Sequence, residues 1–117
     1  MPITVTMNEC YGKKFILNGN LQPAEMFDNS LVYDGDSVYE VLRMVKGNPI
    51  FFTDHMERLA SSVKLQKKEV LTDVSTLRKD IISLTRSDKK REANLKIVFN
   101  YNNGATNYLV YFIEPIY

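Results

Sequence analysis

Residues 35–62 constrain the fold more than any other stretch of the chain. Residues 37–45 form an almost continuous run of apolar and β-favouring side chains, which predicts a strand. Gly47 and Pro49 follow within a short polar break. Because glycine tolerates positive φ and proline fixes its own φ, we expect the chain to reverse there. Residues 50–52 are then expected to form a short second strand.

A helix is predicted to follow at once, with Thr53 as its N-cap and Asp54 placing negative charge at its positive end. Apolar residues recur at the spacing of one buried helical stripe. They are Met56, Leu59, Ala60 and Val63. The polar side carries a second row, formed by His55, Arg58 and Ser62. The stretch therefore predicts a unit of strand, tight turn, strand and helix.

Two hairpins are predicted on either side of this unit. Residues 3–7 alternate apolar and polar side chains, which predicts a strand, and residues 13–17 are expected to form a second short strand that pairs with it. Residues 18–20 are a strong turn signal. Residues 95–101 and 107–113 alternate in the same way around an Asn-Asn-Gly turn. Both pairs favour antiparallel strands with one buried face.

The remaining segments complete the predicted fold. Residues 21–34 are expected to be an irregular loop. Thr72 or Asp73 is expected to cap a second helix that ends near Ser87. Its apolar stripe is Val74, Leu77, Ile81 and Leu84. The fold class is therefore α+β, an antiparallel sheet of about five or six strands covered by two helices. No repeat or linker divides residues 1–117, so we expect a single domain.

Charge and cysteine content exclude several classes of function. The chain carries 15 basic and 14 acidic side chains and a formal net charge of +1. This balance predicts no nucleic acid and no anionic membrane as partner, and the basic run 89–91 is interpreted as a solvated loop. The single Cys10 and single His55 favour no disulfide and no metal site. No signal peptide or membrane span is predicted, so the expected compartment is cytoplasmic.

The central stretch resembles the N-terminal domain of class IV (fold-type IV) pyridoxal-phosphate enzymes. These include D-amino acid aminotransferases, branched-chain amino acid aminotransferases and aminodeoxychorismate lyases. The matching residues are Gly35-Asp36-Ser37-Val38-Tyr39-Glu40-Val41, Gly47, His55-Met56-Glu57-Arg58-Leu59 and Ser62. A looser similarity extends over nearly the whole chain.

The resemblance implies a role for two residues, and strand alternation adds a third. Arg58 matches the arginine that holds the phosphate of pyridoxal phosphate, for which a guanidinium is chemically suited. Tyr39 matches the aromatic residue at the floor of the substrate pocket. Arg43 shares the face of Tyr39 and is a further candidate for substrate binding. Glu40 points to the opposite face and is expected to be structural, pairing with a nearby arginine.

The resemblance also implies that no catalytic residue lies within the chain. In the family, the lysine that forms the Schiff base with the cofactor belongs to a C-terminal domain, which is absent here. Lys96 is interpreted as lying on the solvent side of its strand. We therefore expect residues 1–117 to be inactive alone. The full protein is expected to be a homodimer that moves an amino group between an amino acid and a 2-oxo acid.

The sequence is compatible with more than one function. The D-amino acid branch carries basic residues where this chain has residues 100–106, which contain no arginine or histidine. The D-amino acid assignment is therefore weakened, and the sequence leaves three alternatives. They are a branched-chain-like aminotransferase, a carbon–carbon lyase of the aminodeoxychorismate type, and a stand-alone non-catalytic binding domain of the same fold.

Overall fold

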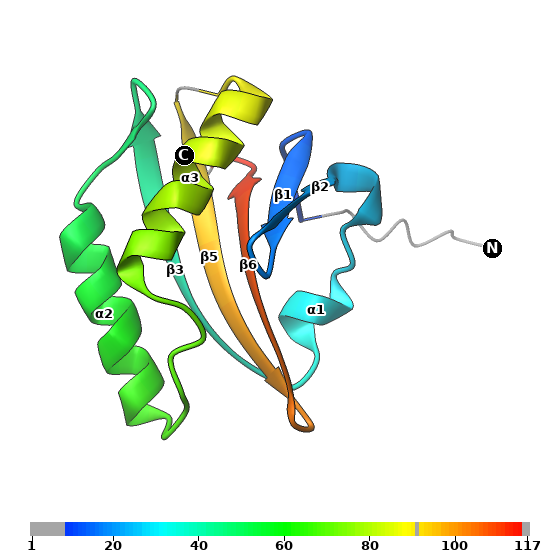
Figure 1. Cartoon of the computed structure of the whole chain (residues 1–117), viewed down its shortest axis with the longest axis vertical. Helices are drawn as coiled ribbons and strands as arrows, with labels where there is room; N and C mark the ends of the chain where they lie inside the picture. The colour runs from blue at the N-terminus through cyan, green and yellow to red at the C-terminus, as the bar shows by residue number, and fades with distance from the viewer. Residues whose placement is uncertain (1–8, 91, 116–117) are drawn as a thin grey trace.

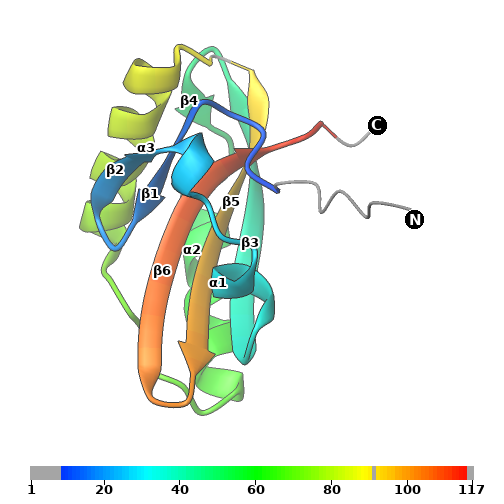
Figure 2. The same cartoon turned by 90° about the vertical axis from the view of Figure 1, so that its right-hand side faces the viewer.

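The computed structural model describes residues 9–90 and 92–115. These residues form a six-stranded antiparallel sheet in the order β2-β1-β6-β5-β3-β4, with helices on both of its faces (Figures 1 and 2). The expected α+β class and strand number are confirmed. The strand predicted at residues 3–7 lies outside the described residues.

The N-terminal hairpin differs from the predicted one. Strand β1 (Lys14–Leu17) pairs with β2 (Asn20–Pro23) and, on its other edge, with β6. The turn between β1 and β2 is the predicted one, because Asn18 and Gly19 both have positive φ, 50° and 85°. The loop expected at residues 21–34 instead holds β2, a 3-10 helix η1 (Ala24–Met26) and helix α1 (Ser30–Tyr33). These elements are three or four residues long, which is too short to give a periodic signal.

The central unit begins with the predicted long strand, β3 (Asp36–Val45). Lys46 and Gly47, with φ of 52° and 78°, form a tight turn that matches the twist of paired strands. Because this turn uses only two residues, the return strand β4 (Asn48–Pro49) comes earlier than expected. The strand predicted at residues 50–52 is therefore wrong.

Helix α2 (Phe52–Leu65) begins one residue before the predicted cap. Phe51 is the N-cap residue, in the left-handed region with φ 55° and without a capping side chain, and Thr53 lies in the first turn. Met56, Leu59 and Val63 are buried as predicted, whereas Ala60 is exposed. The left-handed backbone of Phe51 turns the chain from the sheet into the helix. The apolar run of residues 50–52 gives no sign of this turn in the sequence.

The second half of the chain agrees with the prediction except at Val74, which was expected on the buried stripe of the second helix and is 48% exposed in its first turn. Asp73 caps α3 (Val74–Asp88), because its side chain accepts a hydrogen bond from Thr76 N at 2.7 Å. Strands β5 (Ala93–Asn102) and β6 (Ala105–Ile113) form the long hairpin at the centre of the sheet. Within the described ranges, no helix is long and apolar enough to cross a membrane.

The sheet packs an apolar cluster on each of its faces. The larger cluster joins α2 and α3 to the even-numbered side chains of β3 and β6, such as Leu42 and Val110. The second cluster lies on the opposite face, where Val32 of α1 meets Val98 and Leu109. Only one covered face was expected, so this second layer is an addition. Within residues 9–90 and 92–115, this cluster covers the middle of the sheet and leaves the outer face of β3 open.

Candidate functional site

Neighbouring residues of β3 reach opposite faces of the sheet. Val38 and Leu42 are buried against the helices, so Glu40 between them also faces the helices. Tyr39 faces the other way and is 56% exposed. The candidate residues therefore form two groups, one on each face of a single strand.

On the helical face, Glu40 joins His55 and Arg58. His55 Nδ1 lies 2.8 Å from Glu40 Oε1, and Arg58 Nε lies 3.3 Å from the same oxygen. The side chains of Glu40 and His55 are 12% and 16% exposed, whereas that of Arg58 is 63% exposed. The predicted pairing of Glu40 with a nearby arginine is confirmed.

The local sequence explains this arrangement. His55 and Arg58 are three residues apart on α2 and therefore lie on one side of the helix. Met56 and Leu59, between and beside them, anchor α2 in the core. The contact with Glu40 uses Arg58 Nε and leaves most of the side chain accessible. A guanidinium held in this way can bind a phosphate with its terminal amino groups.

On the open face, Glu9 is the centre of a hydrogen-bonded cluster that includes Lys96. In the sheet register, Val41 lies beside Lys96, and Lys96 beside Tyr111. Lys96 Nζ donates to Glu9 Oε1 at 2.5 Å, and the Tyr111 hydroxyl donates to the same oxygen at 2.7 Å. The Tyr33 hydroxyl donates to the other oxygen of Glu9.

Lys96 also lies against aromatic rings. Its Nζ is 4.6 Å from the ring centroid of Tyr39 and 5.9 Å from that of Tyr33. Its side chain is only 12% exposed, so the interpretation of Lys96 as a solvent-facing residue was wrong. The alternation of β5 gives no sign of this burial, because Glu9 and Tyr33 come from segments without a periodic pattern.

Contacts within the cluster shift the pKa values of its titrating groups. Burial acts to raise the pKa of Glu9, but the hydrogen bonds from Lys96, Tyr33 and Tyr111 outweigh it and hold this pKa below its ordinary value. The hydrogen bond to Glu9, together with burial, raises the pKa of Tyr33 to about 12. Burial and the contact with Glu9 also raise the pKa of Tyr111. The carboxylate of Glu9 is thus stabilised in its charged form.

Arg43 lies on the same open face, at the end of β3 nearer the turn. It is exposed, and its Nη1 donates to Asn94 Oδ1, its neighbour in the sheet register, at 3.5 Å. The structure therefore groups Tyr39 with Arg43, as predicted from strand alternation, and sets Arg58 on the other face.

The segment that contains most of these site residues also identifies the family of the chain. Residues 37–115 match the family described as amino-transferase class IV. The chain belongs to this family. The matched segment contains Tyr39, Glu40, Arg43, Arg58 and Lys96, whereas Glu9 and Tyr33 precede it.

Solved structures of aminotransferases share the fold. A branched-chain amino acid aminotransferase from T.th., complexed with N-(5'-phosphopyridoxyl)-L-glutamate, is 19% identical with a TM-score of 0.76, over 90% of this chain and 42% of that one. The enzyme from Escherichia coli is 17% identical with a TM-score of 0.71, over 89% and 41%. A hypothetical aminotransferase from Mycobacterium tuberculosis, with alpha-ketoglutarate and PMP bound, is 19% identical with a TM-score of 0.71, over 89% and 40%.

These comparisons also show how much of such proteins the chain represents. It spans about 40% of the length of the solved structures that it resembles. None of the curated proteins matches its sequence. The matches therefore establish the family and the fold of the chain.

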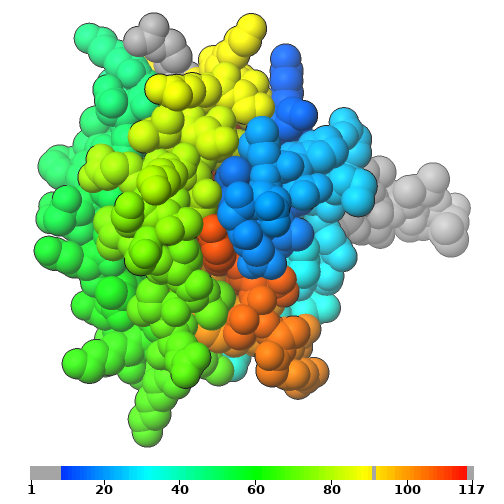
Figure 3. Space-filling model, in the orientation of Figure 1, coloured from blue at the N-terminus to red at the C-terminus, as the bar shows by residue number. Residues whose placement is uncertain are grey.

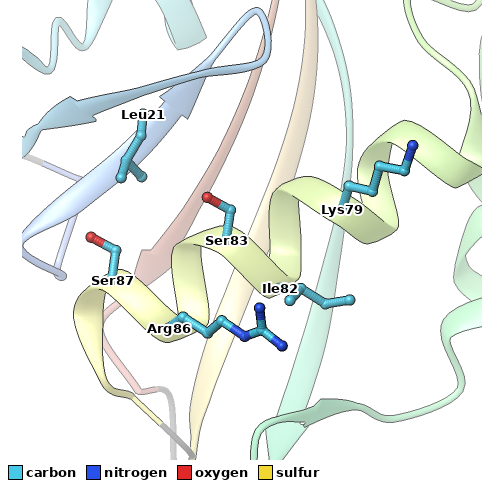
Figure 4. A pocket seen from close by; sticks show the side chains of 6 residues that line it. All are labelled: Leu21, Lys79, Ile82, Ser83, Arg86 and Ser87. Atoms are coloured by element: carbon cyan, nitrogen blue, oxygen red, sulfur yellow. The ribbon is translucent and has the colours of Figure 1, made fainter.

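Two cavities of the class IV domain lie away from these residues. A shallow groove of about 490 Å³ runs between α3 and the β1–β2 hairpin, which Figure 3 shows side by side. It is lined by Leu21, Lys79, Ile82, Ser83, Arg86 and Ser87 (Figure 4). A cavity of about 180 Å³ lies between α2 and α3 near Val70 and Val74. Neither contains a predicted site residue, and within residues 9–90 and 92–115 no group of acidic, histidine or cysteine side chains suits a metal ion.

Proposed function

We propose that this chain forms the part of a pyridoxal-phosphate-dependent aminotransferase that holds the cofactor phosphate and lines one side of the substrate pocket. The reaction of the whole protein is the exchange of an amino group between an amino acid and a 2-oxo acid. Membership of the class IV family supports this proposal. So do the names of the structural neighbours, which are branched-chain amino acid aminotransferases.

The observation that carries the proposal is that Arg58 is held on one side by Glu40 and is accessible on the other. It lies in the matched segment, on a helix fixed by the core, with one side of its guanidinium against Glu40 and 63% of its side chain accessible. A fixed cation that remains accessible suits a phosphate group, because it offers parallel donors with little loss of side-chain freedom. The residues present therefore fit the cofactor.

The open face of β3 suits the substrate. Tyr39 offers an exposed ring there, and the exposed Arg43 adds a positive charge four residues along the strand. These groups would orient an amino acid or 2-oxo acid through its carboxylate and shield it from water. When bound, pyridoxal phosphate supplies the electron-withdrawing ring that amino transfer requires.

The partners belong to the proposal too. We expect the catalytic lysine to lie in a second domain and residues 1–117 alone to be inactive. The exposed Tyr39 and Val41 leave an apolar surface on the sheet that suits such a domain or a second subunit. Borohydride reduction of the native protein with pyridoxal phosphate, followed by peptide mapping, tests this expectation. A reduced adduct on a lysine within residues 1–117 would contradict it.

Binding of pyridoxamine 5'-phosphate tests the role of Arg58. In the native protein, Arg58→Gln is expected to weaken this binding by roughly 10- to 150-fold, because hydrogen bonds to charged groups are worth about 1.5–3 kcal/mol. Binding of pyridoxamine, which lacks the phosphate, should not change. Arg78→Gln is the matched control, since Arg78 is an exposed arginine stacked 4.4 Å from the Phe52 ring. Equal affinities of Arg58→Gln and the wild type would overturn the proposal.

A further inference from the structure

Glu40 is a carboxylate in an unusual place for a charge. It lies between Val38 and Leu42 on the face of β3 that packs against the core, and its side chain is 12% exposed. A charged group removed from water is costly unless it has polar partners. Two partners approach it from α2, and both reach the same oxygen, Oε1.

The contact with His55 fixes the carboxylate. Because a carboxylate at this distance only accepts, the Nδ1 atom of His55 must carry the shared proton. The His55 side chain is itself 16% exposed and sits in the first turn of α2. Glu40 is therefore held by a side chain whose own motion is restricted.

The contact with Arg58 is longer and has a different consequence. At 3.3 Å, Arg58 Nε meets an oxygen that His55 already holds in place. Arg58 is a long, largely exposed side chain that would otherwise sample many rotamers. Glu40 thus restricts the guanidinium on its Nε side, while the rest of the group stays open to a ligand.

We propose that Glu40 and His55 are positioning residues that hold Arg58 in the orientation that binds the phosphate. This inference rests on the proposed function and adds two residues to it. Glu40 binds Arg58, His55 binds Glu40, and neither needs to touch the ligand. All three lie on a strand and a helix joined by one core, which is the kind of support that keeps a binding group in place.

A rival explanation predicts the opposite sign. Glu40 is negative, so it could simply compete with the phosphate for Arg58, and removing its charge would then strengthen binding. If Glu40 instead positions Arg58, Glu40→Gln weakens binding although a negative charge is lost. The direction of the change therefore separates positioning from competition.

The experiment measures binding of pyridoxamine 5'-phosphate to the native protein by calorimetry. Glu40→Gln and His55→Ala are each expected to weaken it by about 2- to 12-fold, the cost of ordering one side chain. His55→Gln, which restores a donor, is expected to recover part of the loss. Glu57→Gln is the matched control, because Glu57 is an exposed carboxylate next to Arg58 in the sequence. Glu57→Gln removes one negative charge near Arg58 and leaves the contact between Glu40 and Arg58 in place.

A second readout does not depend on the ligand. The ¹⁵Nε–¹Hε resonance of Arg58, assigned by its loss in Arg58→Gln, is expected to shift in Glu40→Gln and His55→Ala and to stay in place in Glu57→Gln. This measurement needs only a folded protein and reports directly on the guanidinium. It keeps the proposal testable if one of the variants binds too weakly to measure.

The outcomes separate this inference from the proposed function. Tighter binding of pyridoxamine 5'-phosphate by Glu40→Gln would overturn the positioning role while Arg58 remained the phosphate ligand. An Arg58 resonance that stays in place in both Glu40→Gln and His55→Ala would do the same. Unchanged binding by Arg58→Gln would overturn the proposed function itself. Weaker binding by Glu40→Gln and His55→Ala, with a shifted resonance and an unchanged control, would support both.

Discussion

The carboxylate of Glu9 stabilises the fold through partners distant in sequence. It receives hydrogen bonds from Lys96, Tyr33 and Tyr111, and its pKa lies below the ordinary value of 4.5. A lowered pKa means that the folded state favours the charged form. The stabilisation is therefore fully present above the unfolded pKa and is lost as the pH falls through the folded one.

Glu9→Gln tests this contribution. At pH 7 we expect the free energy of unfolding to fall by roughly 1–3 kcal/mol, because a hydrogen-bonded charge is removed and buried Lys96 loses its partner. The difference from the wild type should shrink as the pH falls from 4.5 through the lower pKa of folded Glu9, below which the wild-type carboxylate is also protonated. Urea unfolding at several pH values measures it, with exposed Glu25→Gln as control. A difference that grows toward low pH would contradict the assignment.

Asp80 behaves in the opposite way. It lies on the buried side of α3, and its carboxylate accepts a hydrogen bond from the Tyr108 hydroxyl at 2.8 Å. Burial raises the pKa of Asp80 above 3.8, and the bond from Tyr108 offsets only part of that rise. The stability linked to Asp80 is therefore greatest below the unfolded pKa and declines as the pH rises through the folded one.

Asp80→Asn should remove this pH dependence. The variant keeps an acceptor for Tyr108 and carries no charge, so its stability relative to the wild type is expected to increase from pH 3 to pH 7. Tyr108→Phe is the companion variant and should cost about 1–3 kcal/mol at pH 7, because it leaves a buried carboxylate without its donor. Thermal unfolding across this pH range measures both. A constant difference between Asp80→Asn and the wild type would refute the assignment.

Among the elements, β3 depends on the glycine at its start. Gly35 has φ +75°, and a Cβ there would meet Tyr101 O at 2.5 Å and Asn102 Cα at 2.9 Å, both in the backbone of β5. The close approach lets β3 begin its pairing with β5 at Asp36. Glycine is therefore required at position 35 both for its positive φ and for the space that a Cβ would occupy.

Gly35→Ala is expected to destabilise the fold more than an equivalent change elsewhere. Gly104 is the matched control, with φ +84° and no atom within 4 Å of a Cβ. Gly104→Ala should cost about 1–2 kcal/mol for the left-handed backbone alone. Gly35→Ala should cost that and the displacement of β5 in addition. Urea unfolding compares the two variants, and equal costs would show that the close approach does not matter.

Elements with a long periodic pattern could be predicted from the sequence, and those set by single residues could not. The strands β3, β5 and β6 and the helix α3 repeat their apolar positions over nine residues or more. The start of α2 depends instead on the positive φ of Phe51, which no propensity favours. The same limit applies to the site. Arg58 and Tyr39 follow from a motif, whereas the burial of Lys96 depends on tertiary contacts with Glu9 and Tyr33.

The molecule as a whole has a sheet with two buried faces at its centre. Leu109 and Val110 are neighbours on β6 and both are 0% exposed, one in each apolar cluster. A sheet covered on one side would leave one of these two residues accessible. The segment containing η1 and α1 is therefore part of the core structure and more than a connection.

Truncation of each residue tests this two-sided core. Leu109→Ala is expected to lower the free energy of unfolding by about 2–5 kcal/mol, as for other buried leucines. Val110→Ala should also be clearly destabilising, whereas Val41→Ala on the open face should change it by less than about 0.5 kcal/mol. Chemical denaturation measures all three. A tolerated Leu109→Ala would mean that the second cluster is not packed in solution.

The alternation of β3 has a consequence for redesign of the protein. Odd positions such as Tyr39 and Arg43 reach one face, and the even position Glu40 reaches the other. Libraries restricted to odd positions would thus vary the open face while the support of Arg58 stays intact. Inserting a single residue before Tyr39 would do the reverse, since it would exchange the two faces from that point on. The open face of β3 is therefore expected to accept replacements, whereas a change in the length of β3 is expected to disturb both faces at once.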